Sequence, residues 1–71
     1  MEALVHIGDN LKTLRLRAAI SQTELAEKAD VAAAAVNRIE RNKVEPHMRT
    51  VRKLARALEV EPVELIEGPR S

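Results

Sequence analysis

Basic side chains, the groups that proteins use to hold phosphate, are concentrated in one part of this chain. Seven lie between residues 38 and 56 (Arg38, Arg41, Lys43, Arg49, Arg52, Lys53 and Arg56), where only Glu40 and Glu45 oppose them, so the local balance is +5. Residues 59–67 carry four glutamates and no basic residue, and the whole chain has a net charge of +1. The basic segment can therefore face phosphate while the acidic segment faces away. The solvated faces of ordinary helices would give the same distribution of charge.

The composition narrows the kind of ligand that these cations can serve. The chain has no Phe, Tyr or Trp, whereas proteins that bind single strands or read RNA stack the bases on aromatic rings. If nucleic acid is the ligand, duplex DNA is favoured. The chain also has no cysteine, and its two histidines, His6 and His47, lie far apart. We therefore expect neither a disulfide nor a metal site.

An enzymatic function finds little support in the sequence. There is no glycine-rich phosphate loop and no arrangement of Ser, His and an acidic residue that indicates nucleophilic catalysis. We therefore expect no catalytic activity and no cofactor. The N-terminus lacks the pattern of a secretory signal, and no run of about 18 apolar residues is present. These observations predict a soluble, cytoplasmic protein, and 71 residues allow one domain at most.

The spacing of apolar residues is helical along most of the sequence. Two sets recur at intervals of three or four residues (Ile7, Leu11, Leu14 and Ala18; Val51, Leu54, Ala55 and Leu58), and each predicts one buried stripe along a helix. We expect an all-α, compact five-helix bundle with helices near residues 8–18, 22–29, 33–41, 51–58 and 62–66. Residues 7–67 would form the domain, 1–6 an N-terminal extension and 68–71 a C-terminal tail.

Several residues are typical of helix ends. Ser21 and Glu24 match the capping-box pattern S-x-x-E, which predicts the start of the second helix. Asp30 and Asn42 tolerate the left-handed conformation and are placed to end the second and third helices. Pro62 suits the first residue of the fifth helix.

The second and third predicted helices are joined by a very short turn. A helix-turn-helix unit needs a small residue where the helices cross, a tight turn, and apolar residues that fix the second helix onto the first. Ala26, Asp30, Val36 and Ile39 meet these needs in order, with Gln22 at the start of the unit. The joint spacing is more specific than any one of these residues.

The chain resembles the phage repressor and Cro-type helix-turn-helix family (XRE-like, with a lambda-repressor-like fold) over residues 7–67. The resemblance rests on IGDNLKTLR, SQTELAEKADVAAAAVNRIERNKVEP and VRKLARALEVEPVELIEG. These segments contain, in order, the motifs L-x-x-L-R, S-Q-x-x-L-A, R-I-E and L-A-x-A-L. The resemblance implies a small transcriptional regulator, more often a repressor than an activator. It would bind double-stranded DNA as a homodimer on a pseudo-palindromic operator, with its third helix in the major groove.

The resemblance also implies which residues contact DNA. The matching positions are Gln22, Ala33, Ala34, Asn37, Arg38, Lys43 and Arg49. Gln22 would meet phosphate or a base edge, the four residues of the third helix would face the groove, and Lys43 and Arg49 would meet phosphate. For Gln22, Lys43 and Arg49 a plain solvated position is the alternative. Arg15 and Glu40 match an ion pair between the first and third helices, so we interpret both as structural.

The chain departs from the family at Ala32–Ala35, where Ser or Thr normally caps the helix and polar residues face the groove. Alanine cannot cap, but its methyl group can touch the thymine methyl. Base reading would then fall to Asn37, suited to adenine, and Arg38, suited to guanine. DNA shape could replace the lost contacts, or the polar residues were removed by design, or specific binding was lost.

A second class of function stays open, a protein-interaction module such as an antitoxin-like subunit or adaptor. The acidic C-terminal end or the helix-turn-helix surface would then dock a protein partner. Dimerisation is suggested by apolar residues near both ends of the chain (Leu4, Val5, Val60, Val63 and Ile66), which would otherwise close the core beneath the fifth helix.

Overall fold

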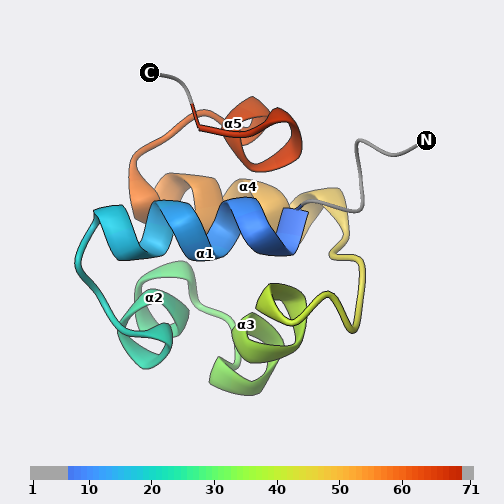
Figure 1. The fold of residues 1–71 in the computed structure, drawn as a ribbon. Coiled ribbons are helices and arrows are strands. Elements are labelled where there is room, and N and C mark those ends of the chain that lie inside the picture. Colours follow the sequence, from blue (N-terminus) through green and yellow to red (C-terminus); the bar gives the residue numbers. More distant parts are fainter. Residues whose placement is uncertain (1–6, 70–71) are drawn as a thin grey trace.

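Five α-helices and no strand make up residues 7–69, the part of the chain that this computed structural model describes. The helices are α1 (Ile7–Arg17), α2 (Gln22–Ala29), α3 (Ala33–Glu40), α4 (Met48–Leu58) and α5 (Pro62–Glu67), shown in Figure 1. The predicted all-α fold is therefore confirmed. Several boundaries differ by one to three residues. Ala18 lies just beyond α1 and is exposed rather than buried, Arg41 follows α3 as its C-cap, and α4 begins at Met48, before the first apolar residue of its stripe.

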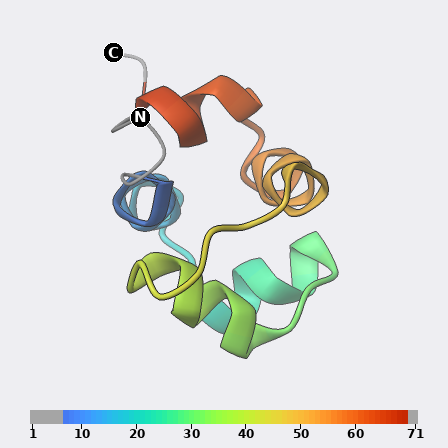
Figure 2. The ribbon, with the colours of Figure 1, turned by 90° about the vertical axis from the view of Figure 1, so that its right-hand side faces the viewer.

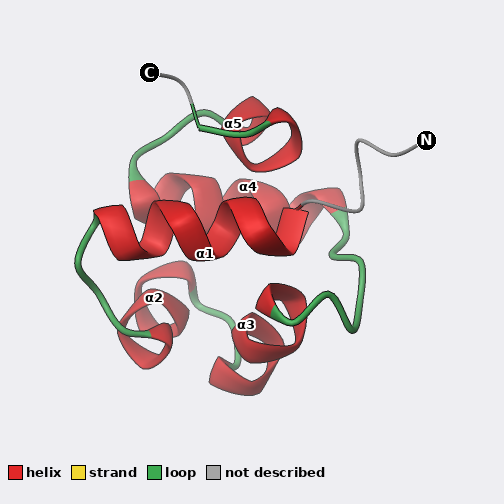
Figure 3. Ribbon diagram, viewed as in Figure 1, coloured by secondary structure: helices red, strands yellow, loops and turns green. Residues whose placement is uncertain are grey.

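The helices lie in three levels. α1 and α4 form the middle level, with α5 above them and the α2–α3 pair below (Figures 1 and 2). α5 packs against α1 and α4, α2 against α3 and α4, and α1 against α3. Short loops make all the connections (Figure 3). The α2–α3 pair is thus held by both middle helices and keeps its lower face open. None of the helices in residues 7–69 combines the length and apolar character needed to span a bilayer.

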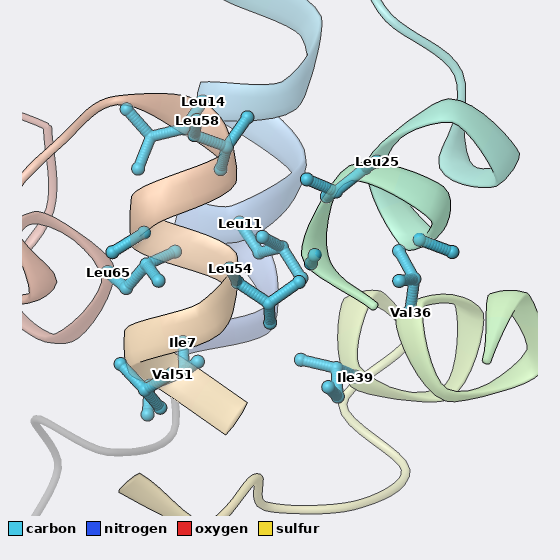
Figure 4. Close-up of a cluster of buried hydrophobic side chains, with 13 residues drawn as sticks. Ile7, Leu11, Leu14, Leu25, Val36, Ile39, Val51, Leu54, Leu58 and Leu65 are labelled. Carbon is cyan, nitrogen blue, oxygen red and sulfur yellow. The ribbon is translucent and has the colours of Figure 1, made fainter. Parts of the chain in front are cut away.

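One apolar cluster holds the levels together. Each helix contributes a side chain with almost no exposed surface: Leu11, Leu25, Val36, Leu54 and Leu65. Figure 4 shows Leu11 and Leu54 between the middle helices and the α2–α3 pair, with Leu25 and Val36 on one side of them and Leu65 on the other, next to α5. The cluster includes every predicted apolar anchor of α2, α3 and α4. Leu16 stands outside it with 57% of its surface exposed, because it falls off the apolar stripe of α1.

The helix ends follow the predicted signals. The Ser21 hydroxyl accepts a hydrogen bond from the Glu24 N–H at 3.0 Å, and the Ser21 N–H donates to the Glu24 carboxylate at 2.7 Å. Asp30 and Asn42 adopt the left-handed conformation, with φ of 58° and 59°. Pro62 is the first residue of α5. Ala32 stands at the N-cap of α3 without any side-chain hydrogen bond, as its methyl group requires.

Two further residues, Ala19 and Glu59, also have positive φ, at 59° and 60°. Ala19 ends α1, and its N–H donates to the Leu16 carbonyl at 3.0 Å. A left-handed conformation brings the Cβ atom close to the following carbonyl oxygen and costs a residue such as alanine about 1–2 kcal/mol. Asp and Asn bear this conformation more easily, so the backbone strain is concentrated at Ala19 and Glu59.

The N-terminus of α1 lies unusually close to the C-terminus of α3. A Cβ atom added at Gly8 would overlap the backbone carbonyl oxygen of Ile39 and the side chain of Asn42. Asn42 also donates from Nδ2 to the Asp9 carboxylate at 3.2 Å. Only glycine allows this approach, which fixes the place where the chain leaves α3.

An ion pair joins α1 to the last residue of α3. Arg15 binds Glu40 with two hydrogen bonds, from Nε to Oε2 at 2.7 Å and from Nη2 to Oε1 at 3.0 Å. Its Nη1 donates to the Ile20 carbonyl at 2.9 Å. The two side chains are 11% and 3% exposed, and the hydrogen bond to Glu40 raises the pKa of Arg15 above its usual value. The expected structural pair is therefore present and almost buried.

Ala19→Gly should stabilise the fold. Glycine removes the Cβ conflict at positive φ, which outweighs the entropy that it adds to the unfolded chain. The expected gain is up to about 1 kcal/mol, or a rise in melting temperature of a few degrees. Ala18→Gly is the matched control, because Ala18 is also exposed but has no positive φ; it should lower the melting temperature. An equal loss in both variants would contradict the strain at Ala19.

Glu40→Ala should lower the melting temperature strongly. It leaves the Arg15 guanidinium nearly buried without its carboxylate, and breaking a buried pair costs about 3–5 kcal/mol. For a domain of this size we expect a fall of more than about 10 °C, measured by thermal denaturation. Glu27→Ala, which removes an exposed glutamate from α2, is the control. Equal melting temperatures for Glu40→Ala and the parent would refute the structural role.

Candidate DNA-binding surface

The turn between α2 and α3 is tight and well fixed. The Val31 N–H donates to the Ala26 carbonyl at 3.0 Å, directly after the left-handed Asp30. Ala26 is 3% exposed, and its small side chain lets the two helices cross closely. Val36 and Ile39 are buried from the other side. The features that the sequence predicted for a helix-turn-helix unit are therefore assembled in one place.

α3 turns one side to the core and the other to solvent. Val36, Ile39 and Glu40 are buried. At about 100° per residue, Ala34 and Arg38 lie opposite them, and Ala33 and Asn37 lie at the edge of that side next to Glu40. Ala33, Ala34 and Arg38 are exposed, and Asn37 is partly buried. Within residues 7–69 the Arg38 side chain has no hydrogen bond or ion pair. α3 thus presents a free guanidinium one turn beyond two side chains that carry no polar group.

Gln22 and Asn37 lie close together on this surface, and the side-chain amides of both form hydrogen bonds. Asn37 donates from Nδ2 to Gln22 Oε1 at 3.3 Å. Gln22 in turn donates from Nε2 to Glu40 Oε1 at 3.0 Å. The predicted contact residue at the start of α2 is therefore partly buried and bound to two residues of α3.

The two predicted phosphate contacts lie on successive parts of the chain. Lys43 is exposed in the loop after α3, and its N–H donates to the Arg38 carbonyl at 2.9 Å, which holds the loop against the helix end. Arg49 is exposed in the first turn of α4 and lines an open depression of ≈ 410 Å³ with His47 and Thr50. Among the described residues no hydrogen bond joins Arg49 to α3.

The basic residues of α4, which belong to the basic segment found in the sequence, are all exposed at helical intervals and line one face of that helix (Arg49, Arg52, Lys53 and Arg56). The link from Gln22 to Glu40 was not predicted. A signal for it was present, because Asn37 and Glu40 stand three residues apart on one helix, where a single side chain from α2 can reach both.

Residues 7–69 show no evident metal-binding site. The residues that the structure describes contain no group of three His, Cys, Asp or Glu side chains placed to hold an ion. The chemistry of the α3 surface is therefore that of hydrogen bonds, methyl contacts and a guanidinium.

Comparison with known proteins agrees with this geometry. A family model described as helix-turn-helix matches residues 11–65. The crystal structure of the restriction-modification controller protein C.AhdI from Aeromonas hydrophila is similar, with a TM-score of 0.84 and 34% sequence identity over 92% of this chain and 98% of that chain. No curated protein sequence matches. The matched model spans most of the chain, so the protein belongs to the helix-turn-helix family of DNA-binding transcription regulators, in its phage repressor and Cro-like branch.

Proposed function

We propose that this protein is a sequence-specific transcription regulator that places α3 in the major groove of duplex DNA. The observation that carries the proposal is the two-sided character of α3. Its apolar side is fixed to the core by Val36 and Ile39, and its other side is exposed and supported by α2 through Gln22. A helix held in this way can enter the groove without having to reorder.

Few groups on α3 can read bases, which makes their roles distinct. Arg38 can donate two hydrogen bonds to guanine, and Asn37 can donate to and accept from adenine. Ala33 and Ala34 offer only methyl groups, which fit the thymine methyl and let the helix lie close to the base pairs. Lys43 and Arg49 would bind phosphates on either side of the groove and set the position of the helix.

A homodimer on a pseudo-palindromic operator is part of the proposal. Val60, Val63 and Ile66 are only partly buried around α5, so some of their apolar surface is available to a second copy. Leu4 and Val5, which the sequence added to this surface, lie outside the described residues. Sedimentation at micromolar concentration tests the dimer, and a protein that stays monomeric on DNA would contradict the palindrome.

Binding should weaken steeply as salt is raised, and Arg38→Ala should change what is bound. Duplexes selected from a random pool provide the ligand. If six or more phosphates are neutralised, the affinity should fall by about a thousandfold or more between 50 and 200 mM salt. Arg38→Ala should lose about 1–3 kcal/mol of discrimination at one base pair.

Arg56→Ala is the matched control for this experiment, since it removes an exposed arginine from α4. It should leave the base preference unchanged. Binding that responds little to salt, or a partner protein that binds in place of DNA, would favour the protein-interaction module instead.

Ala33→Gln and Ala34→Gln should alter sequence preference far more than stability. Both positions are exposed, so the change in unfolding free energy should stay within about 0.5 kcal/mol. The new amides can donate and accept in the groove and should select different bases. Ala18→Gln, at an exposed alanine outside the helices, serves as control. The same selected sequences for parent and variants would mean that another face meets the DNA.

A further inference from the structure

Hydrogen bonds connect the buried ion pair to the exposed side of α3. The connection runs from Arg15 to Glu40, from Glu40 to Gln22, and from Gln22 to Asn37, with donor–acceptor distances of 2.7, 3.0 and 3.3 Å. It passes through the Glu40 carboxylate, which is 3% exposed, and ends on the helix surface proposed to meet DNA. The side chain that could read a base is therefore tied to the core of the fold.

The buried Glu40 carboxylate determines which group donates and which accepts in each hydrogen bond of this connection. A carboxylate paired with an arginine can only accept hydrogen bonds, so Gln22 must turn its NH₂ group toward Glu40. Its carbonyl oxygen Oε1 then has to point toward Asn37 and can only accept. Asn37 must consequently turn its own NH₂ group toward Gln22. Glu40 thus decides which way round both amides lie.

The amide of Asn37 is left with a defined set of free groups. One N–H is used by Gln22, while the other N–H and the oxygen Oδ1 remain. Adenine presents an acceptor, N7, and a donor, the N6 amino group, to the major groove, and an amide with one N–H and one oxygen matches them. An amide turned the other way round would place the two groups in the wrong order.

We propose that Gln22 is a positioning residue for base reading, which acts through Asn37 without contacting the base. Gln22 fixes the rotation of the Asn37 amide before DNA binds. Glu40 orients the Gln22 amide, so that its oxygen faces Asn37. One N–H of Gln22 is held by Glu40 and its Oε1 by Asn37, so the positioning role depends on the acceptor Oε1 and not on the second N–H. This inference rests on the proposed DNA-binding function and names one residue that determines its specificity.

Two substitutions separate positioning from a merely structural role. Gln22→Met keeps the length of the side chain and removes both hydrogen bonds. Gln22→Lys keeps a donor for Glu40 but offers no acceptor to Asn37. Thr23→Ala, at the exposed next residue of α2, is the control. Melting temperatures establish that all three variants fold, which is expected because Glu40 keeps both hydrogen bonds from Arg15.

The first measurement needs no DNA. NMR of the free protein should show the two side-chain amide protons of Asn37 as distinct in the parent and in Thr23→Ala, with one protected from exchange. Both Gln22 variants should lose this protection. Unchanged Asn37 amide signals in Gln22→Met would overturn the inference.

The second measurement uses duplexes that differ only at the base pair where Asn37→Ala abolishes preference. Loss of one hydrogen bond predicts that Gln22→Met and Gln22→Lys reduce the preference for adenine there by roughly 2- to 10-fold. The preference that depends on Arg38 should not change, and Gln22→Met combined with Asn37→Ala should discriminate no worse than Asn37→Ala alone.

Three results would count against the inference. Equal weakening on every duplex by Gln22→Met, with a salt dependence reduced by about one phosphate, would make Gln22 a phosphate contact. Parent-like preference in Gln22→Lys would make its role structural. A parent that prefers no duplex would remove the proposed function and with it the reading role, while the NMR signals would still report whether the hydrogen bond exists.

Discussion

The fold depends on the pairing of Arg15 with Glu40 across the gap between α1 and α3. α3 has only eight residues and an alanine at its N-cap, and a helix of that length gains little from its own hydrogen bonds. Tertiary contacts must therefore hold it. The apolar anchors fix its inner side, and the two hydrogen bonds between Arg15 and Glu40 fix the rotation of its last turn. Planar guanidinium and carboxylate groups have one favourable mutual orientation, so the pair sets an angle as well as a distance.

Most of the fold was accessible from the sequence because local and tertiary preferences agree. Ser21, Asp30, Asn42 and Pro62 each stand where their backbone chemistry is favourable, and the apolar spacing of α4 is unambiguous. Ala18 was predicted wrongly because its place on the helical stripe continues the period of α1, while the left-handed Ala19 has already ended the helix. Nothing in the alanine side chain indicates positive φ, so such a position is hidden from propensity arguments.

The candidate surface was accessible only in part. Spacing and family resemblance place Ala33, Ala34 and Arg38 on the open side of α3, and the structure has them exposed. Whether a polar side chain is free or already bound depends on partners from other helices, and periodicity does not contain that information. Gln22 shows the difference, since its position is typical of a contact residue while its amide is held by Glu40 and Asn37.

Gly8 has a consequence for how the protein adapts to its target. The backbone of α1 lies against the Ile39 carbonyl with no side chain between them, and backbone groups cannot change rotamer to make room. Together with the ion pair beside it, this contact leaves α3 little freedom to tilt or turn relative to α1. On an operator whose groove does not fit, the duplex would have to supply the adjustment by bending or by changing its groove width. In the proposed function, a rigid α3 would select sequences by their flexibility as well as by their base edges.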